Sequence, residues 1–191
     1  QTASIVTTSG TVAGNTITVL KTKLSLSSAT IGSSSARART TVDDLANLTV
    51  SADSAGDLTI STVTLRFAGT LLSTTSSAIT TSTITLLDAS TNAAPAGCAS
   101  SCTDTITLVS TTDRAAIFNF STAFIVTQGT SKTFKVRMDS SVAGDVANVT
   151  ENLTVTLDNT TDINWGDGST AIGLGLETPV VPFIVVSGLS Y

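Results

Sequence analysis

Residues 132–139 read Lys-Thr-Phe-Lys-Val-Arg-Met-Asp, and this stretch decides the fold class. Phe134, Val136 and Met138 alternate with polar or charged residues, so one face of an extended chain is apolar and the other is polar. The same alternation returns in residues 152–158, after a loop rich in Ser, Gly and Ala. We therefore expect two half-buried strands that pair antiparallel with each other over a core.

The rest of the chain repeats this pattern in about ten short segments separated by Ser, Thr and Gly, with almost no helical periodicity. This spacing predicts an all-β protein, an antiparallel β-sandwich of the immunoglobulin-like or jelly-roll-like kind, with little or no helix. At most a turn of helix is expected at residues 45–46 and at residues 172–176.

Three segments carry more specific expectations. The apolar residues of 58–67 change phase along the segment, which predicts a long strand that bends, by a bulge or by crossing from one sheet to the other. Residues 27–39 are small and polar and are expected to form a loop. The tail, residues 179–186, is apolar in both phases and is expected to be buried on both faces.

We expect residues 15–191 to form a single sandwich, with two sandwiches split near residues 90–103 as the alternative. Residues 1–14 are a sparse strand whose apolar residues are Ile5, Val6 and Val12. They add least to their own core. Two interpretations stay open for them: a strand donated to the sheet edge of a neighbouring subunit, and a strand that completes its own sheet.

The composition excludes some partners. The net charge is −5 and the pI is near 4.4, which argues against nucleic acid because its binding needs a basic stripe. Arg37 and Arg39, a close arginine pair, are expected on a solvated loop. No run of apolar residues is long enough for a transmembrane helix, and no signal peptide is expected. The first residue is Gln1, which fits a processed terminus or a fragment of a longer chain.

Cys98 and Cys102 are the two cysteines of the chain. A structural zinc site needs four ligands, and the chain has no histidine, so a disulfide across a turn is the preferred interpretation. Such a bond indicates an oxidising, extracytoplasmic location. The alternative is two free thiols in a loop.

We expect no enzyme activity and no catalytic residue, because the absence of histidine removes the usual general base and the Ser-His-Asp triad. The only cofactor considered is calcium. Oxygen-bearing side chains at short spacing suit this hard cation, and the candidate ligands are Asp158, Asp162, Asn164 and Asp167. The competing and preferred interpretation is a turn in which these side chains bond their own backbone.

Glycans are the second group of candidate modifications. Five Asn-x-Ser/Thr sequons provide candidate acceptors, of which Asn119, Asn152 and Asn159 are expected at outward or loop positions. The five are Asn47, Asn119, Asn148, Asn152 and Asn159.

Residues 163–169, Ile-Asn-Trp-Gly-Asp-Gly-Ser, resemble the Gly-Asp-Gly turn of PKD-type immunoglobulin-like modules of cell-surface proteins. The Ser/Thr-rich, histidine-free and lysine-poor composition is similar to that of prokaryotic surface-layer and extracellular filament proteins. This resemblance implies a structural role at the cell surface or outside the cell and carries over no functional residue.

The leading hypothesis is a structural subunit of a pilus-like extracellular filament or a surface layer, a homopolymer joined by β-strand addition. The alternative is an immunoglobulin-like adhesion or spacer module of a larger cell-surface protein.

Overall fold

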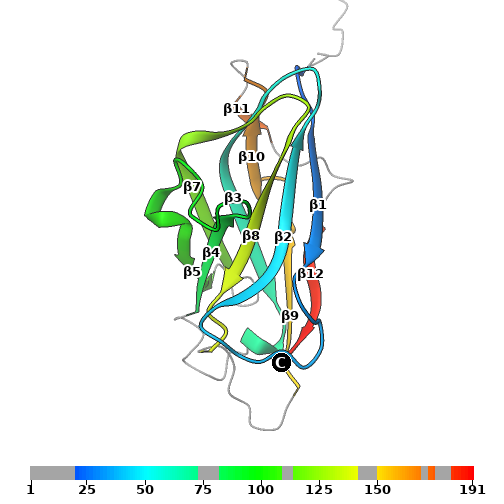
Figure 1. The fold of residues 1–191 in the computed structure, drawn as a ribbon, viewed down its shortest axis with the longest axis vertical. Helices are drawn as coiled ribbons and strands as arrows, with labels where there is room; N and C mark the ends of the chain where they lie inside the picture. The colour runs from blue at the N-terminus through cyan, green and yellow to red at the C-terminus, as the bar shows by residue number, and fades with distance from the viewer. Residues whose placement is uncertain (1–19, 73–81, 109–113, 142–149, 169–171, 175–181) are drawn as a thin grey trace, which may run out of the picture.

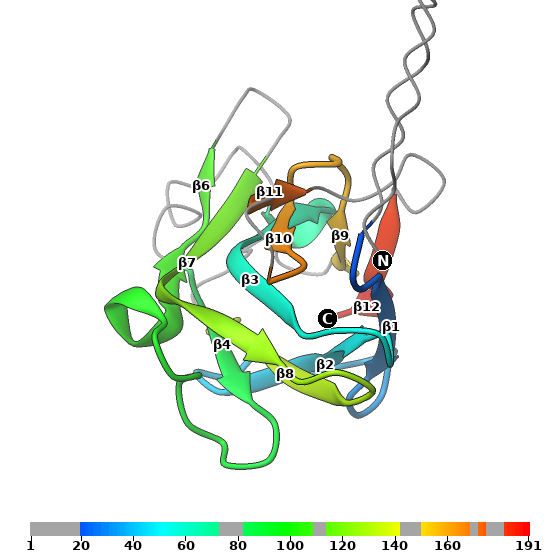
Figure 2. The same ribbon diagram turned by 90° about the horizontal axis from the view of Figure 1, so that it is seen from above.

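The computed structural model describes residues 20–72, 82–108, 114–141, 150–168, 172–174 and 182–191. Two antiparallel sheets face each other across a common core, with their strands running mostly along the long axis of the molecule (Figures 1 and 2). The described chain begins near one end of that axis, ahead of β1, and its C-terminus, Tyr191, lies at the other end (Figure 1). The predicted all-β antiparallel sandwich is therefore confirmed.

The first sheet has five strands in an order that differs from their order in the chain. Listed across the sheet, they are β1 (Leu24–Thr30), β2 (Asp43–Ala52), β8 (Ser131–Met138), β4 (Thr83–Asp88) and β5 (Thr103–Thr105).

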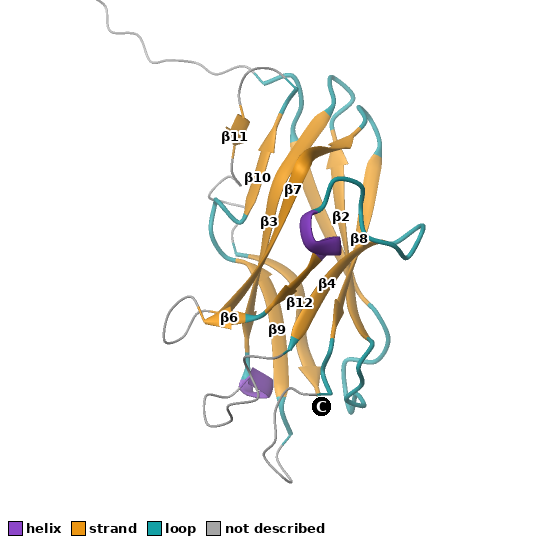
Figure 3. Cartoon of the chain, turned by 90° about the vertical axis from the view of Figure 1, so that its left-hand side faces the viewer, coloured by secondary structure: helices purple, strands orange, loops and turns teal. Residues whose placement is uncertain are grey.

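The second sheet is branched. Its main path is β11 (Ile172–Leu174), β10 (Ile163–Gly166), β3 (Leu58–Ala68), β7 (Arg114–Val126) and β6 (Thr107–Leu108). β9 (Asn152–Leu157) pairs with the end of β3 and with β12 (Phe183–Ser190). In the described part of the chain, the helical segments are the short 3₁₀ turns η1 (Thr70–Leu72) and η3 (Ala99–Cys102), drawn in purple in Figure 3.

The period-2 alternation places the expected residues in the core. Phe134, Val136 and Met138 of β8 are fully buried, as are the three apolar residues of β9. Phe134 also packs on Phe120 and Phe124 of β7, with ring centroids 6.3 and 5.0 Å away. This aromatic contact joins the two sheets, because β7 and β8 belong to different ones.

The predicted pairing of β8 with β9 is wrong. β8 pairs with β2 and β4 in the first sheet, whereas β9 pairs with β3 and β12 in the second. The two strands thus lie on opposite sides of the core. Alternation fixes which face of a strand is buried, and it carries no information about which strand is the neighbour.

The helical turn expected at residues 45–46 is also wrong, because both residues lie inside β2. A register shift between Asp44 and Ala46 turns two consecutive side chains, Leu45 and Ala46, into the core. A bulge interrupts the alternation in this way, so the sequence pattern there does not look like a strand. Similarly, Ile172–Leu174 forms β11, and part of the expected loop 27–39 belongs to β1.

The phase change in residues 58–67 is a bulge and not a crossing between sheets, since the pairing of β3 with β7 shifts between Ile60 and Thr62 and β3 stays in the second sheet. The first half of β3 pairs with β10 on its other edge, and its last three residues pair with β9 instead. Gly69 follows at φ +128°, and a Cβ there would lie 2.2 Å from the Asn152 backbone oxygen. Only glycine allows this approach of β3 to β9.

The tail differs in part from the expectation. Val185 and Val186 are buried, but Ile184 is 52% exposed, so β12 has one buried face over this stretch.

Both sheets combine strands from before and after residues 90–103. No helix in the described ranges is long and apolar enough to cross a membrane.

Candidate functional site

The free edge of β1 is the first candidate site. β1 pairs along all seven residues with β2, and in the described part of the chain it has no second ladder partner. β12 lies beside it, and Ser28 Oγ donates to the Ile184 carbonyl at 2.9 Å. An edge with unpaired backbone groups can accept a further strand.

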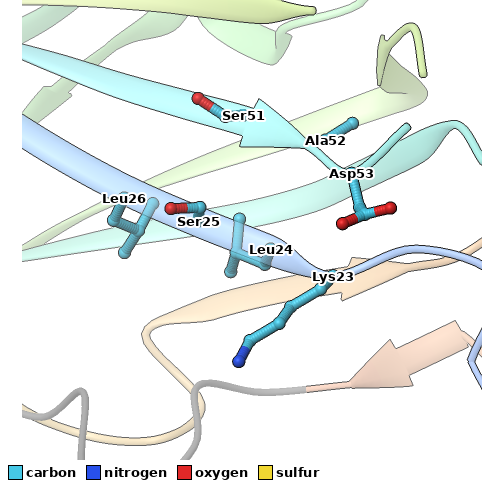
Figure 4. Close-up of a pocket in the computed structure, with 7 residues that line it drawn as sticks. All are labelled: Lys23, Leu24, Ser25, Leu26, Ser51, Ala52 and Asp53. Carbon is cyan, nitrogen blue, oxygen red and sulfur yellow. The ribbon is translucent and has the colours of Figure 1, made fainter. Parts of the chain in front are cut away.

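A groove of about 480 Å³ opens beside the N-terminal half of this edge. Leu24 and Leu26 extend into it from the same side of β1 and are only half-buried against the core (Figure 4). Lys23 and Asp53 place charges beside it. We call this feature the β1 groove; its described lining residues are Lys23, Leu24, Ser25, Leu26, Ser51, Ala52 and Asp53.

The start of the described chain lies at the same end of the molecule as the groove. The Lys21 backbone N–H donates to Asp167 Oδ2 at 2.9 Å, just after β10, and the Asp53 N–H donates to Thr22 Oγ1 at 3.1 Å. The chain therefore crosses from the second sheet to the first before β1 begins. Ile5, Val6 and Val12, the residues of the predicted assembly strand, lie outside the described residues, as do all of residues 1–19.

The opposite end of the molecule holds a polar cluster that the sequence did not predict. Arg37 pairs with Asp43 and also donates to the Ile31, Ser33 and Asp44 carbonyls. Its side chain is only 9% exposed, so the expectation of a solvated loop is wrong for this residue. The loop wraps around the guanidinium, and four hydrogen bonds, rather than an apolar sequence, account for its buried position.

Tyr191 joins this cluster from the C-terminal end. Its hydroxyl donates to Asp43 Oδ2 at 2.6 Å, and its backbone exchanges hydrogen bonds with Glu151. Glu151 is almost fully buried and pairs with Arg39. Burial, followed by the hydrogen bond to Asp43, raises the pKa of the Tyr191 hydroxyl well above its ordinary value.

A second charged group lies on the outer face of the first sheet. Arg137 donates to both carboxylate oxygens of Asp44, at 2.6 and 3.2 Å, and Lys135 lies 3.4 Å from the same carboxylate. The hydrogen bond from Arg137 lowers the pKa of Asp44. This group is a cross-strand ion pair of β2 and β8.

The four candidate calcium ligands are placed around the β9–β10 connection but not around one point. Asp162 binds Arg66, with three contacts of 2.7–3.0 Å, and accepts the Asp158 and Asn159 N–H groups at 2.8 and 2.9 Å. Asp167 accepts from Lys21 instead. In the described ranges, no three acidic or cysteine side chains come together to hold a metal.

This arrangement fits the turn interpretation, in which an aspartate bonds the backbone of its own loop. Calcium binding by Asp158, Asp162, Asn164 and Asp167 stays a prediction.

Cys98 and Cys102 form the predicted disulfide, with their Cα atoms 5.2 Å apart. Three consecutive non-glycine residues, Ser100 to Cys102, have φ between 51° and 55°. Cys102 is fully buried in the core, and Cys98 forms an isolated bridge with Phe120 of β7. The bond thus fixes a left-handed turn against the second sheet and is a structural feature of that turn.

The asparagines of the sequons differ in how exposed they are to solvent. Asn119, Asn152 and Asn159 are exposed, as expected for acceptors, whereas Asn47 is half-buried on β2. Asn148 lies outside the described residues. Because an acceptor must be accessible, the first three are the better candidates, and their glycosylation stays a prediction.

Comparison of the chain with models of known protein families, with curated proteins and with solved structures finds no match.

Proposed function

We propose that this chain is a structural subunit that assembles with copies of itself by strand addition at the β1 edge, in an extracellular filament or surface layer. The observation that carries the proposal is that the β1 edge, which has no second ladder partner among the described residues, lies beside an apolar groove. Main-chain bonds to the edge would supply affinity, and the groove would select alternate apolar side chains of the incoming strand.

Residues 1–14 are the proposed donor. They contain Ser, Thr and Gly with a few apolar residues. Val6 and Val12 share one face of an extended strand and would enter the groove, whereas Ile5 lies on the other face. The described chain starts at Leu20, at the end of the sandwich where the groove opens. A donor that leaves one subunit there can reach the groove of an adjacent copy.

The chemistry of the described surface supports a structural role. Several charged side chains lie in ion pairs between segments far apart in the chain, such as Arg66 with Asp162 and Arg137 with Asp44. These pairs stabilise the position of β2, β3 and β8. The disulfide supports the extracytoplasmic location in this proposal, because such bonds persist in oxidising compartments.

The second candidate function is an adhesion or spacer module in a larger surface protein. The start of β1 and the C-terminus lie near opposite ends of the long axis, which favours it (Figure 1). Modules linked in series need their entry and exit at opposite ends. This alternative predicts a protein that stays monomeric in solution.

The experiment places a charge in the groove and compares it with the same charge outside it. Leu26 faces the groove, whereas Ala29, three residues further along β1, lies on the exposed face. We expect Leu26→Lys to abolish assembly, because an incoming strand would have to bury an unpaired ammonium. Ala29→Lys should assemble like the wild type.

Sedimentation and negative-stain electron microscopy measure the assembly, and circular dichroism checks that both variants are folded. Equal assembly of the two variants would remove the β1 groove from the proposal.

A further inference from the structure

The flank of the sandwich opposite β1 is closed by the segment that contains the disulfide. This flank faces the viewer in Figure 3, where the turn η3 is drawn in purple beside β7. η3 contacts β7 of the second sheet and β4 of the first, and β5, which follows it directly, pairs with β4. Residues 97–105 therefore connect the two sheets on this side. We call residues 97–102 the disulfide turn.

The edge of β7 that faces away from β3 is the feature that this segment covers. β6 pairs with this edge over the first two residues of β7, and further along it has no ladder partner among the described residues. Its outward groups bond to the segment instead. The Ile117 N–H donates to Asp104 Oδ2 at 2.7 Å, and the Ser121 N–H donates to the Gly97 carbonyl at 2.8 Å. These are donors that a further strand would otherwise use.

The disulfide turn has a backbone that the covalent bond holds in place. The three consecutive residues that end at Cys102 have φ between 51° and 55°, angles that residues other than glycine adopt rarely and almost never in succession. Cys102 is fully buried in the core, and Cys98 bridges to Phe120 of β7. The bond thus ties the residues on the β7 edge to a residue anchored in the core. Without it, we expect the turn to leave this conformation and Gly97 to leave the edge.

The β7 edge is complementary to the same edge of a second copy of the chain. Ile117 and Ile125 are 45% and 54% exposed and lie four residues to either side of Ser121, on the same outward face of the strand. In an antiparallel pair of two β7 strands centred on Ser121, each Ile117 lies opposite Ile125 of the second copy. Such a pair buries both isoleucines of each copy in cross-strand contacts, and its two-fold symmetry makes the contact the same from both sides.

The direction of the main-chain donors agrees with this register. The Ser121 N–H points out of the edge, because it donates to the disulfide turn. In the centred pair, Ser121 of each copy can therefore exchange two main-chain hydrogen bonds with its counterpart. The Ile117 N–H points the same way and would bond in the same ladder.

We propose that the disulfide turn keeps the β7 edge closed, and that reduction of the Cys98–Cys102 bond opens it to antiparallel pairing with β7 of a second copy. A dithiol supplies the two electrons and two protons that convert the bond into two thiols, and the dithiol is itself oxidised to a disulfide. In an oxidising environment the turn confines strand addition to the β1 edge.

The test measures the native size of Leu26→Lys, which removes assembly at the β1 groove, with and without dithiothreitol. We expect a monomer in the oxidised state and a dimer after reduction, with an unchanged β-sheet signal in circular dichroism. Cys98→Ala combined with Cys102→Ala, in the same background, should dimerise without any reductant. This control separates loss of the bond from other effects of dithiothreitol.

Two charge variants in the Leu26→Lys background test the register. Ile117→Lys combined with Ile125→Lys sets lysine opposite lysine in both cross-strand contacts, so the reduced protein should stay monomeric. Ile117→Glu combined with Ile125→Lys sets opposite charges against each other and should restore part of the dimer. The two variants differ at a single position, which makes each the control for the other.

Amide hydrogen exchange, followed by NMR in the variant with two lysines on β7, measures opening of the edge without pairing. We expect the Ser121 amide to exchange at least about tenfold faster after reduction, because it loses its acceptor on Gly97. The amides of β8 should keep their rates.

Unchanged exchange at Ser121 or loss of the β-sheet signal on reduction would overturn the proposal. A reduced protein that stays monomeric, or that dimerises equally in both charge variants, would overturn the β7 interface. Failure of assembly at β1 is a separate result. Oxidised Leu26→Lys that still assembles would contradict the β1 groove, whereas the β7 edge is tested by the change on reduction.

Discussion

The hydrogen bond between the Tyr191 hydroxyl and Asp43 joins the end of the chain to the start of β2. The raised pKa of Tyr191 means that the folded protein holds the phenolic proton more tightly than the unfolded chain, whose tyrosine titrates near pH 10. The stabilisation is therefore complete below about pH 10 and declines as the pH rises above that value.

We predict that Tyr191→Phe lowers the free energy of unfolding by about 1.5–3 kcal/mol at pH 7, because it removes a hydrogen bond to a charged group. Above pH 10 the difference between wild type and variant should shrink. Urea unfolding at pH 7 and at two values above pH 10 measures it. Tyr191 is the only tyrosine, so its absorbance titration in the native protein reports the same pKa directly. A normal titration near pH 10 would contradict the described contact.

The sequence predicted the role of some single residues, but it did not predict which residues they contact across the fold. The disulfide between Cys98 and Cys102 was predictable, because two cysteines four residues apart have few alternatives. The pairing of Arg37 with Asp43 and Tyr191 was not predictable, since its members are up to 154 positions apart and no pattern links them.

The junction of β3 with β9 is the element most sensitive to a small change. Gly69 has φ +128° and would place a Cβ 2.2 Å from the Asn152 carbonyl oxygen, a backbone atom that cannot move aside. Gly188 on β12 also has a positive φ, but no atom lies within 4 Å of its Cβ position. A comparison of substitutions at the two glycines therefore distinguishes the cost of a steric clash from the cost of a strained backbone.

We predict that Gly188→Ala costs about 1–2 kcal/mol and Gly69→Ala roughly 3–5 kcal/mol, because only the second adds a steric clash to the strained backbone. Urea unfolding of the two variants gives both values. Similar losses in the two variants would mean that β9 does not approach β3 as described.

The alternation of β8 and β9 correctly predicted which residues of these strands are buried, because the period-2 pattern is local. The partners of β8 and β9 were wrong, because pairing is decided by the whole core. The start of β2 was missed for another local reason: its bulge places Leu45 and Ala46 on the same side. For the candidate site, the sequence predicted a donor strand at residues 1–14. It did not predict the β1 edge, because the small polar residues 27–30 look like a loop.

At the scale of the whole molecule, two sheets enclose one core, and the free edge of β1 lies beside an apolar groove. Buried apolar surface stabilises the sandwich itself, whereas Leu24 and Leu26 remain half-buried and can gain burial from an added strand. We propose assembly at this edge because its half-buried leucines can still lose exposed apolar surface there.

The most direct test of this proposal is the native size of the purified chain, with and without residues 1–14, by light scattering and electron microscopy of the same samples. We predict long, uniform assemblies for the full chain of 19.3 kDa and, for the truncated chain, a folded monomer that is smaller by the mass of residues 1–14. Two results would contradict it. A full chain that remains monomeric favours the spacer module, and a truncated chain that still assembles excludes residues 1–14 as the donated strand.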